Sequence, residues 1–285
     1  MDERIMVVGA EGMLGKDLVK VLGERYEVVA LGKEELDITA YREVKRWVKQ
    51  VSPRIVIDAA GYTDVDGCER RSRLAFAVNG EGAKNLARAA SLVKAKVVYI
   101  STDYVFDGKK ESPYTEEDPL NPLNVYGESK VMGERYVEKF ADDYLIVRTQ
   151  WLYGLGGRNF VETILSLSER QERIEVVNDQ IGTPTYTLDL SRAIATLLEK
   201  DLWGIFHISN SGQCSWYDFA CEILRQAGID EVEVIPISSA DLTRPARRPL
   251  YSVLSNEKLR REGGCEMRPW QEALKDYLSE RERSR

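Results

Sequence analysis

The chain has 285 residues, of which 43% are hydrophobic, 31% are charged and 9% are aromatic. This composition is typical of a folded globular protein and excludes a disordered or fibrous chain. The net charge is -7 at pH 7, and the cations are interleaved with acids along the chain. No basic surface that could hold a nucleic-acid backbone is therefore expected.

Short β-branched runs alternate with amphipathic segments in the first half of the chain. Strands are expected at residues 4–8, 26–31, 55–59 and 96–101, and helices at residues 14–22, 41–51 and 74–92. This alternation predicts a parallel sheet with helices on both faces, joined by right-handed crossovers. The expected fold class is therefore α/β, with a doubly wound parallel sheet of the Rossmann type.

The second half of the chain is less regular. A loop over residues 109–124 precedes an expected helix at 126–140 and a strand at 144–148, and shorter elements follow. They comprise helices at 160–168, 187–199, 216–227 and 271–281 and strands at 175–177 and 204–209. We expect an NAD(P)-binding domain from residues 1–152 with 186–209. A smaller α/β sugar-nucleotide substrate lobe would comprise residues 153–185 with 210–285.

The apolar segments are too short to cross a membrane, since the longest have the length of single strands. The N-terminal residues lead directly into the first strand, with no recognisable signal peptide. A cytoplasmic protein is therefore expected.

Cysteine and histidine are too scarce for several kinds of site. The cysteines, Cys68, Cys214, Cys221 and Cys265, form no C-x-x-C pair, and His207 is the only histidine. A zinc site and a disulfide framework are therefore not expected. Catalysis by a histidine base beside serine or cysteine would require His207, whose place in an apolar strand favours a structural role.

The first expected strand ends in a glycine-rich turn, Gly9-Ala10-Glu11-Gly12-Met13-Leu14-Gly15. Glycines at this spacing permit a tight turn, so the N–H groups at the start of the following helix can approach a pyrophosphate. The alternative is a turn needed only for helix packing. The position between a strand and a helix favours dinucleotide binding.

The end of the second expected strand bears on the choice of cofactor. Folds that bind NAD often place an acid there to hold the ribose hydroxyls, but this strand ends Leu31-Gly32-Lys33. A cation at this point would attract the 2′-phosphate of NADP, so NADPH is favoured and NADH stays open. The alternative is that Lys33 is a solvated loop residue.

Tyr126 and Lys130 open an expected helix with Y-x-x-x-K spacing, which places both on one face, about 6 Å apart along the axis. A nearby ammonium would lower the pKa of the phenol from about 10 toward neutrality, as a general acid requires. The fourth expected strand ends at Ser101 and Thr102, at the edge of the sheet where such folds bind ligands. A hydroxyl there would stabilise a carbonyl oxygen that gains charge.

Together these motifs resemble the extended short-chain dehydrogenase/reductases. The matching segments are the turn at residues 9–15, Ser101-Thr102-Asp103-Tyr104-Val105-Phe106-Asp107-Gly108 and Tyr126-Gly127-Glu128-Ser129-Lys130. Within that family, residues 58–66, 148–154, 179–185 and 248–254 resemble the dTDP-4-dehydrorhamnose reductases. This resemblance covers essentially the whole chain.

The resemblance implies reduction, by NADPH or NADH, of the C4 ketone of dTDP-4-keto-6-deoxy-L-mannose to dTDP-L-rhamnose. It identifies Thr102, Tyr126 and Lys130 as the catalytic trio, and places Thr102, Asp103 and Trp151 against the sugar nucleotide. With the residues named above, the expected cofactor site comprises Gly9, Gly12, Met13, Leu14, Gly15, Lys33, Asp37, Ile38, Ala60, Gly61, Tyr62, Thr63, Tyr126 and Lys130.

Asp17 departs from the pattern, because some members carry a glutamate there that helps bind magnesium between subunits. No metal site is expected from the residues themselves, but metal dependence stays open. The expected partner is a nucleotide-sugar substrate, with a homodimer left open and neither nucleic acid nor membrane. Arg244, Arg247 and Arg248 could grip a diphosphate or belong to a surface loop.

Two other functions fit the same resemblance. One is a non-catalytic, NADP-binding regulatory subunit of methionine adenosyltransferase, and the other is a different nucleotide-sugar ketoreductase or epimerase. The intact Thr102, Tyr126 and Lys130 favour catalysis. Asp103-Tyr104 follows Thr102 where epimerases and dehydratases commonly have an acid pair, which favours simple reduction.

Overall fold

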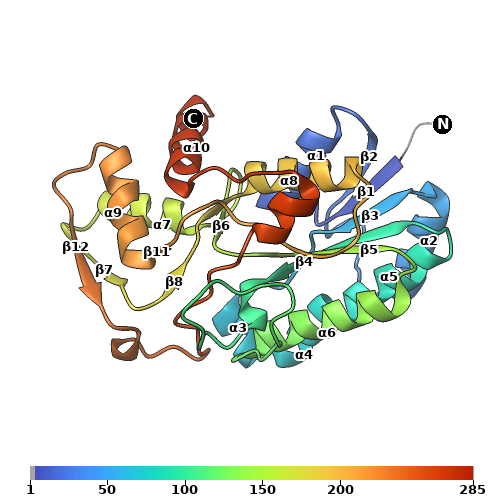
Figure 1. Ribbon diagram of the computed structural model, residues 1–285, viewed down its shortest axis with the longest axis horizontal. Coiled ribbons are helices and arrows are strands. Elements are labelled where there is room, and N and C mark those ends of the chain that lie inside the picture. The colour runs from blue at the N-terminus through green and yellow to red at the C-terminus, as the bar shows by residue number, and fades with distance from the viewer. Residues whose placement is uncertain (1–3, 285) are drawn as a thin grey trace.

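The computed structural model describes residues 4–284. Its centre is a six-stranded parallel sheet in the order β2-β1-β3-β4-β5-β10 (Figure 1). The strands are β1 (Arg4–Val8), β2 (Glu27–Leu31), β3 (Ile55–Asp58), β4 (Lys96–Thr102), β5 (Tyr144–Thr149) and β10 (Gly204–His207). The expected α/β class with a doubly wound parallel sheet is confirmed.

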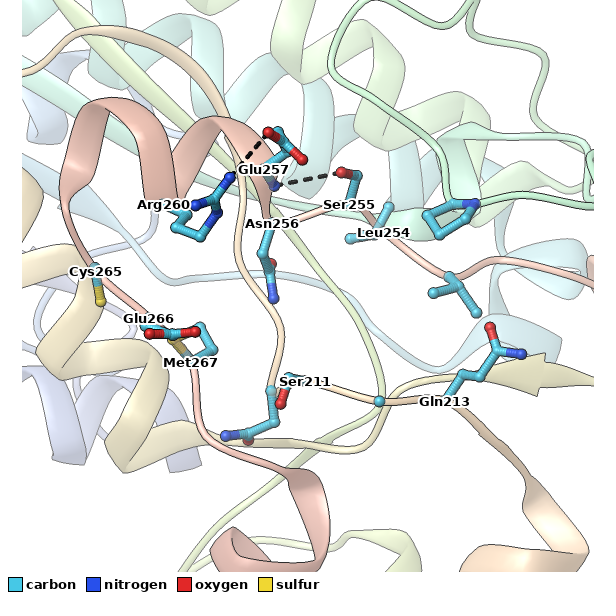
Figure 2. Close-up of a pocket in the computed structure, with 14 residues that line it drawn as sticks. Ser211, Gln213, Leu254, Ser255, Asn256, Glu257, Arg260, Cys265, Glu266 and Met267 are labelled. Atoms are coloured by element: carbon cyan, nitrogen blue, oxygen red, sulfur yellow. Dashed lines mark hydrogen bonds and ion pairs between the residues drawn. The ribbon is translucent and has the colours of Figure 1, made fainter.

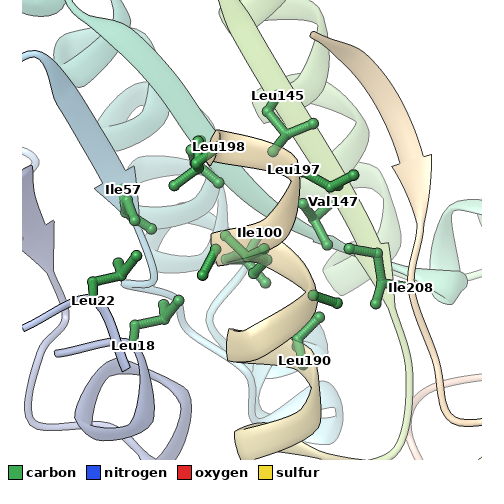
Figure 3. Packing of buried hydrophobic residues seen from close by; sticks show 14 of the residues in the cluster. Leu18, Leu22, Ile57, Ile100, Leu145, Val147, Leu190, Leu197, Leu198 and Ile208 are labelled. Carbon is green, nitrogen blue, oxygen red and sulfur yellow. The ribbon is translucent and has the colours of Figure 1, made fainter. Parts of the chain in front are cut away.

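Helices cover both faces of this sheet. On one face lie α1 (Met13–Leu22) and α8 (Thr187–Glu199), and on the other α2 (Tyr41–Val51), α5 (Ala83–Ser91) and α6 (Val125–Phe140). In Figure 3, Leu18 of α1 and Leu190 of α8 pack with Ile57 and Ile100 of the strands. Because successive strand residues face opposite sides, both faces need apolar side chains, and the strands read as nearly continuous apolar runs.

The long helix expected over residues 74–92 is interrupted. It consists of α4 (Ser72–Ala75), a π-helical segment η1 (Phe76–Gly82) and α5, and a short helix α3 (Val65–Arg70) precedes it. A π-helical turn is commonly found near functional sites, and here it carries Asn79 toward the end of β3. Sequence periodicity missed α3 because six residues are too few to show a helical repeat.

A smaller lobe packs around aromatic side chains. Its elements are α7 (Phe160–Ser168), α9 (Trp216–Gln226), α10 (Trp270–Arg283) and the parallel pair β7 (Arg173–Val177) and β12 (Glu233–Ile237). Two-residue pairs, β6 (Leu152–Tyr153) with β9 (Thr185–Tyr186) and β8 (Ile181–Gly182) with β11 (Cys214–Ser215), connect it to the rest. The strand β12 was not predicted. The division into 1–152 with 186–209 and 153–185 with 210–285 stays a proposal.

The short helical turns η2 (Asp103–Val105), η3 (Ser239–Asp241) and η4 (Leu259–Gly263) complete the fold. Between residues 4 and 284, no helix combines the length and the apolar character needed to cross a bilayer.

Candidate active site

The strand order changes direction between β1 and β3. From β1 the chain goes to β2 on one side of β1, and the next strand, β3, lies on the opposite side of β1. In open α/β sheets, ligands bind outside the carboxyl ends of the strands at such a point. The turn after β1 and the segment after β3 meet there. Gly9 has φ +75°, and a Cβ atom on it would lie 2.6 Å from the Ala60 nitrogen. Two of the expected cofactor segments are therefore adjacent.

The start of α1 fits the pyrophosphate of a dinucleotide. The turn is tight, since a Cβ atom on Gly15 would lie 2.2 Å from the Gly9 carbonyl oxygen. Gly12 precedes the helix, no side chain caps its first N–H groups, and its first turn carries no acid. These N–H groups and the positive end of the helix dipole can accept a phosphate.

Leu14, Ile38 and Asp37 were also expected to contact the cofactor. The side chains of Leu14 and Ile38 are 7% and 5% exposed and belong to the cores on either side of the sheet, so only their backbones could contact a cofactor. The exposed carboxylate of Asp37 accepts hydrogen bonds from the nitrogen and hydroxyl of Thr39.

The end of β2 is more acidic than the sequence pattern indicated. Lys33 is exposed there, but Glu35 accepts a hydrogen bond from the Gly32 nitrogen at 2.8 Å. The Glu11 carboxylate lies against Gly32, where a Cβ atom would be 2.7 Å from Oε2. The expectation of a strand end without acids was therefore wrong, because Glu11 and Glu35 reach it from separate turns. Lys33 alone does not decide between NADPH and NADH.

Thr102, Tyr126 and Lys130 lie where β4 ends and α6 begins. The Thr102 hydroxyl lies close enough to the Tyr126 phenol to lower the pKa of that phenol, and it donates to Asp103 Oδ1 at 2.9 Å. The Tyr104 ring contacts the Tyr126 ring edge to face, with centroids 5.8 Å apart. The structure thus brings the hydroxyl and the phenol of the expected trio into contact.

The contacts of Lys130 are with the Tyr99 ring and with buried acids. Its Nζ lies 4.1 Å from the centroid of the Tyr99 ring, and its side chain is buried. Burial lowers the pKa of Lys130 to about 8, while the charges of Asp58 and Glu134 oppose that change. Burial also raises the pKa of Asp58 to about 6, against the opposing effect of Lys130.

Tyr126 does not have the lowered pKa that the spacing suggested. Burial raises the pKa of its phenol, the hydrogen bond from Thr102 opposes this, and the charge of Asp103 adds to it. Lys130 is not among the main influences on the pKa of Tyr126. The expectation that Lys130 brings the Tyr126 pKa toward neutrality was wrong for this arrangement.

Buried hydrogen bonds hold the start of α6 in place. Asn124 caps the helix by accepting from the Gly127 nitrogen at 2.8 Å. Asn79 accepts from the Tyr62 nitrogen at 2.8 Å and donates to the Ser129 hydroxyl at 2.9 Å, which ties the segment after β3 to α6. Sequence reasoning missed Asn79, because only the interrupted helix places it here.

A buried charge pair lies behind the trio. Arg148 donates to Glu134 through Nε at 2.9 Å and Nη2 at 2.7 Å, and both side chains are 2% exposed. Ser101 also donates to Glu134. Glu134 follows Tyr126 and Lys130 at the same spacing of four, so all three lie on one face of α6, and this spacing is the signal in the sequence that points to Glu134.

His207 belongs to this buried network. Its Nδ1 lies 3.0 Å from the Tyr114 carbonyl oxygen, and its Nε2 lies 3.4 Å from Arg148 Nη1. Burial and the charge of Arg148 lower the pKa of His207 to about 3. The neutral ring with its proton on Nδ1 fits both neighbours, since it donates to the carbonyl and accepts from the guanidinium.

A cavity of about 700 Å³ opens beside the trio, between the sheet and the smaller lobe. Thr63 and Tyr104 line its inner end, and the ring of Tyr104 contacts Tyr126. Its wall also includes Asp66, Arg158, Phe160, Gln180, Trp216, Arg244 and Arg248. A cavity of this size that joins a phenol to arginines and aromatic rings suits a polar, phosphate-bearing ligand with a flat base.

None of the expected substrate residues, Thr102, Asp103 and Trp151, lines this cavity itself. Trp151, with φ +47°, stacks on Trp216 with ring centroids 3.6 Å apart, and it is Trp216 that lines the cavity. Asp103 is 2% exposed, beneath Thr102. Trp216 was not among the expected substrate residues, because nothing local distinguishes the two tryptophans.

The arginines of residues 244–248 differ in their partners. Arg248 donates to both oxygens of Asp66, at 3.2 and 2.9 Å. Arg244 lines the cavity and has no ion-pair partner within residues 4–284. Arg247 is exposed and does not line the cavity. Arg244 is therefore the guanidinium best placed to bind an anion.

A second cavity, of about 450 Å³, lies apart from the expected site residues (Figure 2). Its wall includes Arg260, which pairs with Glu257, and Cys265 near Glu266. None of the expected cofactor, catalytic or substrate residues lines it.

Asp17 lies on α1 and accepts a hydrogen bond from the Thr187 hydroxyl, and burial raises the pKa of its carboxyl. Within residues 4–284, no group of three or more histidine, cysteine or acidic side chains is arranged to hold a metal ion.

Comparisons with known proteins place this architecture in a family. The family described as "RmlD substrate binding domain" matches residues 3–283. The spore coat polysaccharide biosynthesis protein SpsK of Bacillus subtilis is 43% identical over 98% of each chain. A dTDP-4-dehydrorhamnose reductase of Streptomyces griseus is also 43% identical, over 95% of this chain and 91% of its own.

A solved structure is similarly close. The dTDP-4-dehydrorhamnose reductase of Bacillus anthracis, solved in complex with NADP, has a TM-score of 0.95 and 43% identity over 98% of this chain and 100% of its own. These findings confirm the resemblance drawn from the motifs. The chain belongs to the RmlD substrate binding domain family, and with it to the extended short-chain dehydrogenase/reductases.

Proposed function

We propose that this protein is an NADPH-dependent reductase that converts the C4 ketone of dTDP-4-keto-6-deoxy-L-mannose to the alcohol of dTDP-L-rhamnose. The observation that carries the proposal is the contact between the Thr102 hydroxyl and the Tyr126 phenol, next to Tyr104 at the inner end of the 700 Å³ cavity. The relatives named as reductases of this sugar nucleotide, and the NADP in one of their structures, support the substrate and the cofactor.

The cofactor would lie across the carboxyl edge of the sheet. The uncapped N–H groups at the start of α1, after Gly12, fit its pyrophosphate, and Gly61, Tyr62 and Thr63 would contact the middle of the dinucleotide. When bound, its reduced nicotinamide supplies a hydride to C4 of the sugar. Lys130 would hold the nicotinamide ribose, and the carboxylate of Asp58 beside it favours the charged ammonium.

Tyr126 donates the proton to the ketone oxygen as the hydride arrives. The raised pKa of its phenol keeps that proton in place until negative charge develops on the oxygen. Thr102 donates a hydrogen bond that stabilises the charge as it forms. Because the cavity begins at Tyr104, beside Tyr126, a sugar at its inner end lies against the acid.

The outer part of the cavity would bind the nucleotide. Arg244 is free to pair with the diphosphate, with Arg158 on the same wall. Trp216 and Phe160 offer aromatic faces to the base. Trp151 would support Trp216 by stacking on its other side. A homodimer stays a proposal that the mass of the protein in solution tests.

The deciding experiment follows the loss of reduced-nicotinamide absorbance with the purified protein and dTDP-4-keto-6-deoxy-L-mannose, with NADPH and NADH compared. Tyr126→Phe is expected to lower kcat by about 10²–10⁴-fold and to leave the Kd for NADPH nearly unchanged, since only a proton donor is lost. Tyr136→Phe is the matched control, because this phenol lies on the same helix but bonds to Glu81.

Turnover of a different 4-keto sugar nucleotide, but not of this one, would move the assignment to another ketoreductase. Clear NADPH binding without any turnover would favour a non-catalytic, regulatory role. Wild-type turnover by Tyr126→Phe would show that the assigned acid is wrong.

A further inference from the structure

Asp103 is a buried carboxyl to which the proposed reduction gives no chemical step. It is 2% exposed and follows Thr102 at the end of β4. Its Oδ1 lies 2.9 Å from the Thr102 hydroxyl oxygen, and its Oδ2 is buried without a hydrogen-bond partner of normal geometry. A buried carboxylate with an unpaired oxygen is unfavourable, whereas the neutral acid needs fewer partners.

The surroundings of Asp103 are polar but supply little positive charge. Burial raises the pKa of its carboxyl to about 7, while hydrogen bonds from Ser252, Thr102 and the backbone oppose this. No cation is among the main influences on the pKa of Asp103. The arginines that act on the neighbouring Tyr104 are Arg248, which is paired with Asp66, and Arg244, which lines the cavity. Near neutral pH, Asp103 therefore exchanges readily between the acid and the carboxylate.

Thr102 lies between this carboxyl and the acid of the reaction. Thr102 contacts Asp103 on one side and Tyr126 on the other, and its oxygen also accepts from the Tyr104 nitrogen at 3.2 Å. A hydroxyl has one proton to donate and two lone pairs to accept with. Thr102 can thus accept a proton from Asp103 while it gives its own to Tyr126.

We propose that Asp103 is the proton source that restores the Tyr126 phenol through Thr102 after each reduction. The inference rests on the proposed reductase function. The ketone gains a hydride at carbon and the Tyr126 proton at oxygen, which leaves a phenolate. Thr102 protonates the phenolate, Asp103 protonates Thr102, and the resulting carboxylate takes one proton from solvent. Each turnover thus consumes one hydride and one solvent proton.

The first test is the pH dependence of kcat for wild type and Asp103→Asn. Wild-type kcat should fall as pH rises through the ionisation of Asp103, because only the acid form can deliver a proton. Asp103→Asn should lower kcat by about 10-fold or more and remove that part of the profile, since an amide cannot complete the relay. Asp107→Asn, four residues along the same segment, should retain the wild-type profile.

A second variant tests the relay without removing the carboxyl. The Ser252 hydrogen bond lowers the pKa of Asp103, so Ser252→Ala should move the fall in kcat to higher pH and leave it otherwise intact. This result would be decisive even if Asp103→Asn did not fold. An unshifted profile in Ser252→Ala, with normal turnover, would overturn the proposal.

An infrared titration provides a readout that needs no turnover. The wild-type protein should show the carbonyl band of a protonated carboxylic acid that titrates near pH 7, and Asp103→Asn should lack that component and keep only the one that Asp58 gives near pH 6. A wild-type protein that reduces no ketone would refute the proposed function but leave this titration readable. An active Asp103→Asn with an unchanged kcat profile, or with only a raised KM, would show that Asp103 merely contacts substrate and would overturn the relay.

Discussion

The two walls of the candidate site are built in different ways. On the sheet side, Thr102 and Lys130 are buried on regular elements and backed by the Glu134–Arg148 pair. On the other side, Trp216 and Arg244 come from the smaller lobe and from an irregular segment, and Arg244 is exposed. Groups that move protons need fixed distances, whereas groups that capture a substrate must be open to solvent. Changes on the sheet side should therefore alter stability, and changes on the other side should alter KM.

The largest effect is expected from Arg148→Met, which leaves the buried carboxylate of Glu134 without its partner. The free energy of unfolding, measured in urea, should fall by about 3–5 kcal/mol. The double variant Glu134→Leu with Arg148→Met should recover part of this loss, because no buried charge remains. A double variant less stable than the single one would contradict this account.

Gly15→Ala should be the next in size, because its Cβ atom would lie 2.2 Å from the Gly9 carbonyl oxygen and force the turn open. We expect a loss of about 2–3 kcal/mol in unfolding free energy and weak NADPH binding. Gly12→Ala is the matched control, since its Cβ atom would lie 3.4 Å from the same oxygen. It should keep the wild-type stability, and equal losses in both variants would refute the steric argument.

Because its pKa is low in the folded protein, His207 should lower the free energy of unfolding at acid pH. Its pKa is about 3 when folded, below the 6.5 of the unfolded chain, so it contributes stability above pH 6.5 that is lost as pH falls toward 3. By pH 5 this loss is about 2 kcal/mol. The raised pKa values of Asp58 and Asp103 act in the opposite direction.

The test of His207 is therefore a difference between two proteins. Urea unfolding of wild type and His207→Asn at pH 8 and pH 5 should show a smaller loss on acidification in the variant. An identical loss in both would mean that His207 does not titrate as its burial implies.

The smallest effect is expected for Arg244, on the wall of the site that lies opposite the sheet. Arg244→Gln should raise KM for the sugar nucleotide about 10-fold, equivalent to about 1.4 kcal/mol, with little change in kcat or stability. Arg247→Gln should leave KM unchanged, because that side chain does not line the cavity. A fall in kcat for Arg244→Gln without a change in KM would argue against a binding role.

Local sequence signals were sufficient for much of the catalytic wall. The alternation of strands and helices predicted the parallel sheet, and the strand-to-helix glycine turn predicted the segment that fits a pyrophosphate. The spacing of Tyr126 and Lys130 placed them on one helical face. It did not predict their electrostatics, since the directions of the pKa shifts depend on Asp58, Tyr99 and Thr102 from other strands.

The sequence by itself determined the fold class, the strand that ends in the glycine turn and the hydroxyl, phenol and ammonium of the expected trio. These features depend on hydrophobic period, turn chemistry and helical spacing, which act over a few residues. Only the tertiary structure decided that Glu11 and Glu35 reach the end of β2, that Trp216 lines the cavity and that Asp103 is buried beside Thr102. Contacts and burial of this kind depend on how distant segments pack together, which no local pattern records.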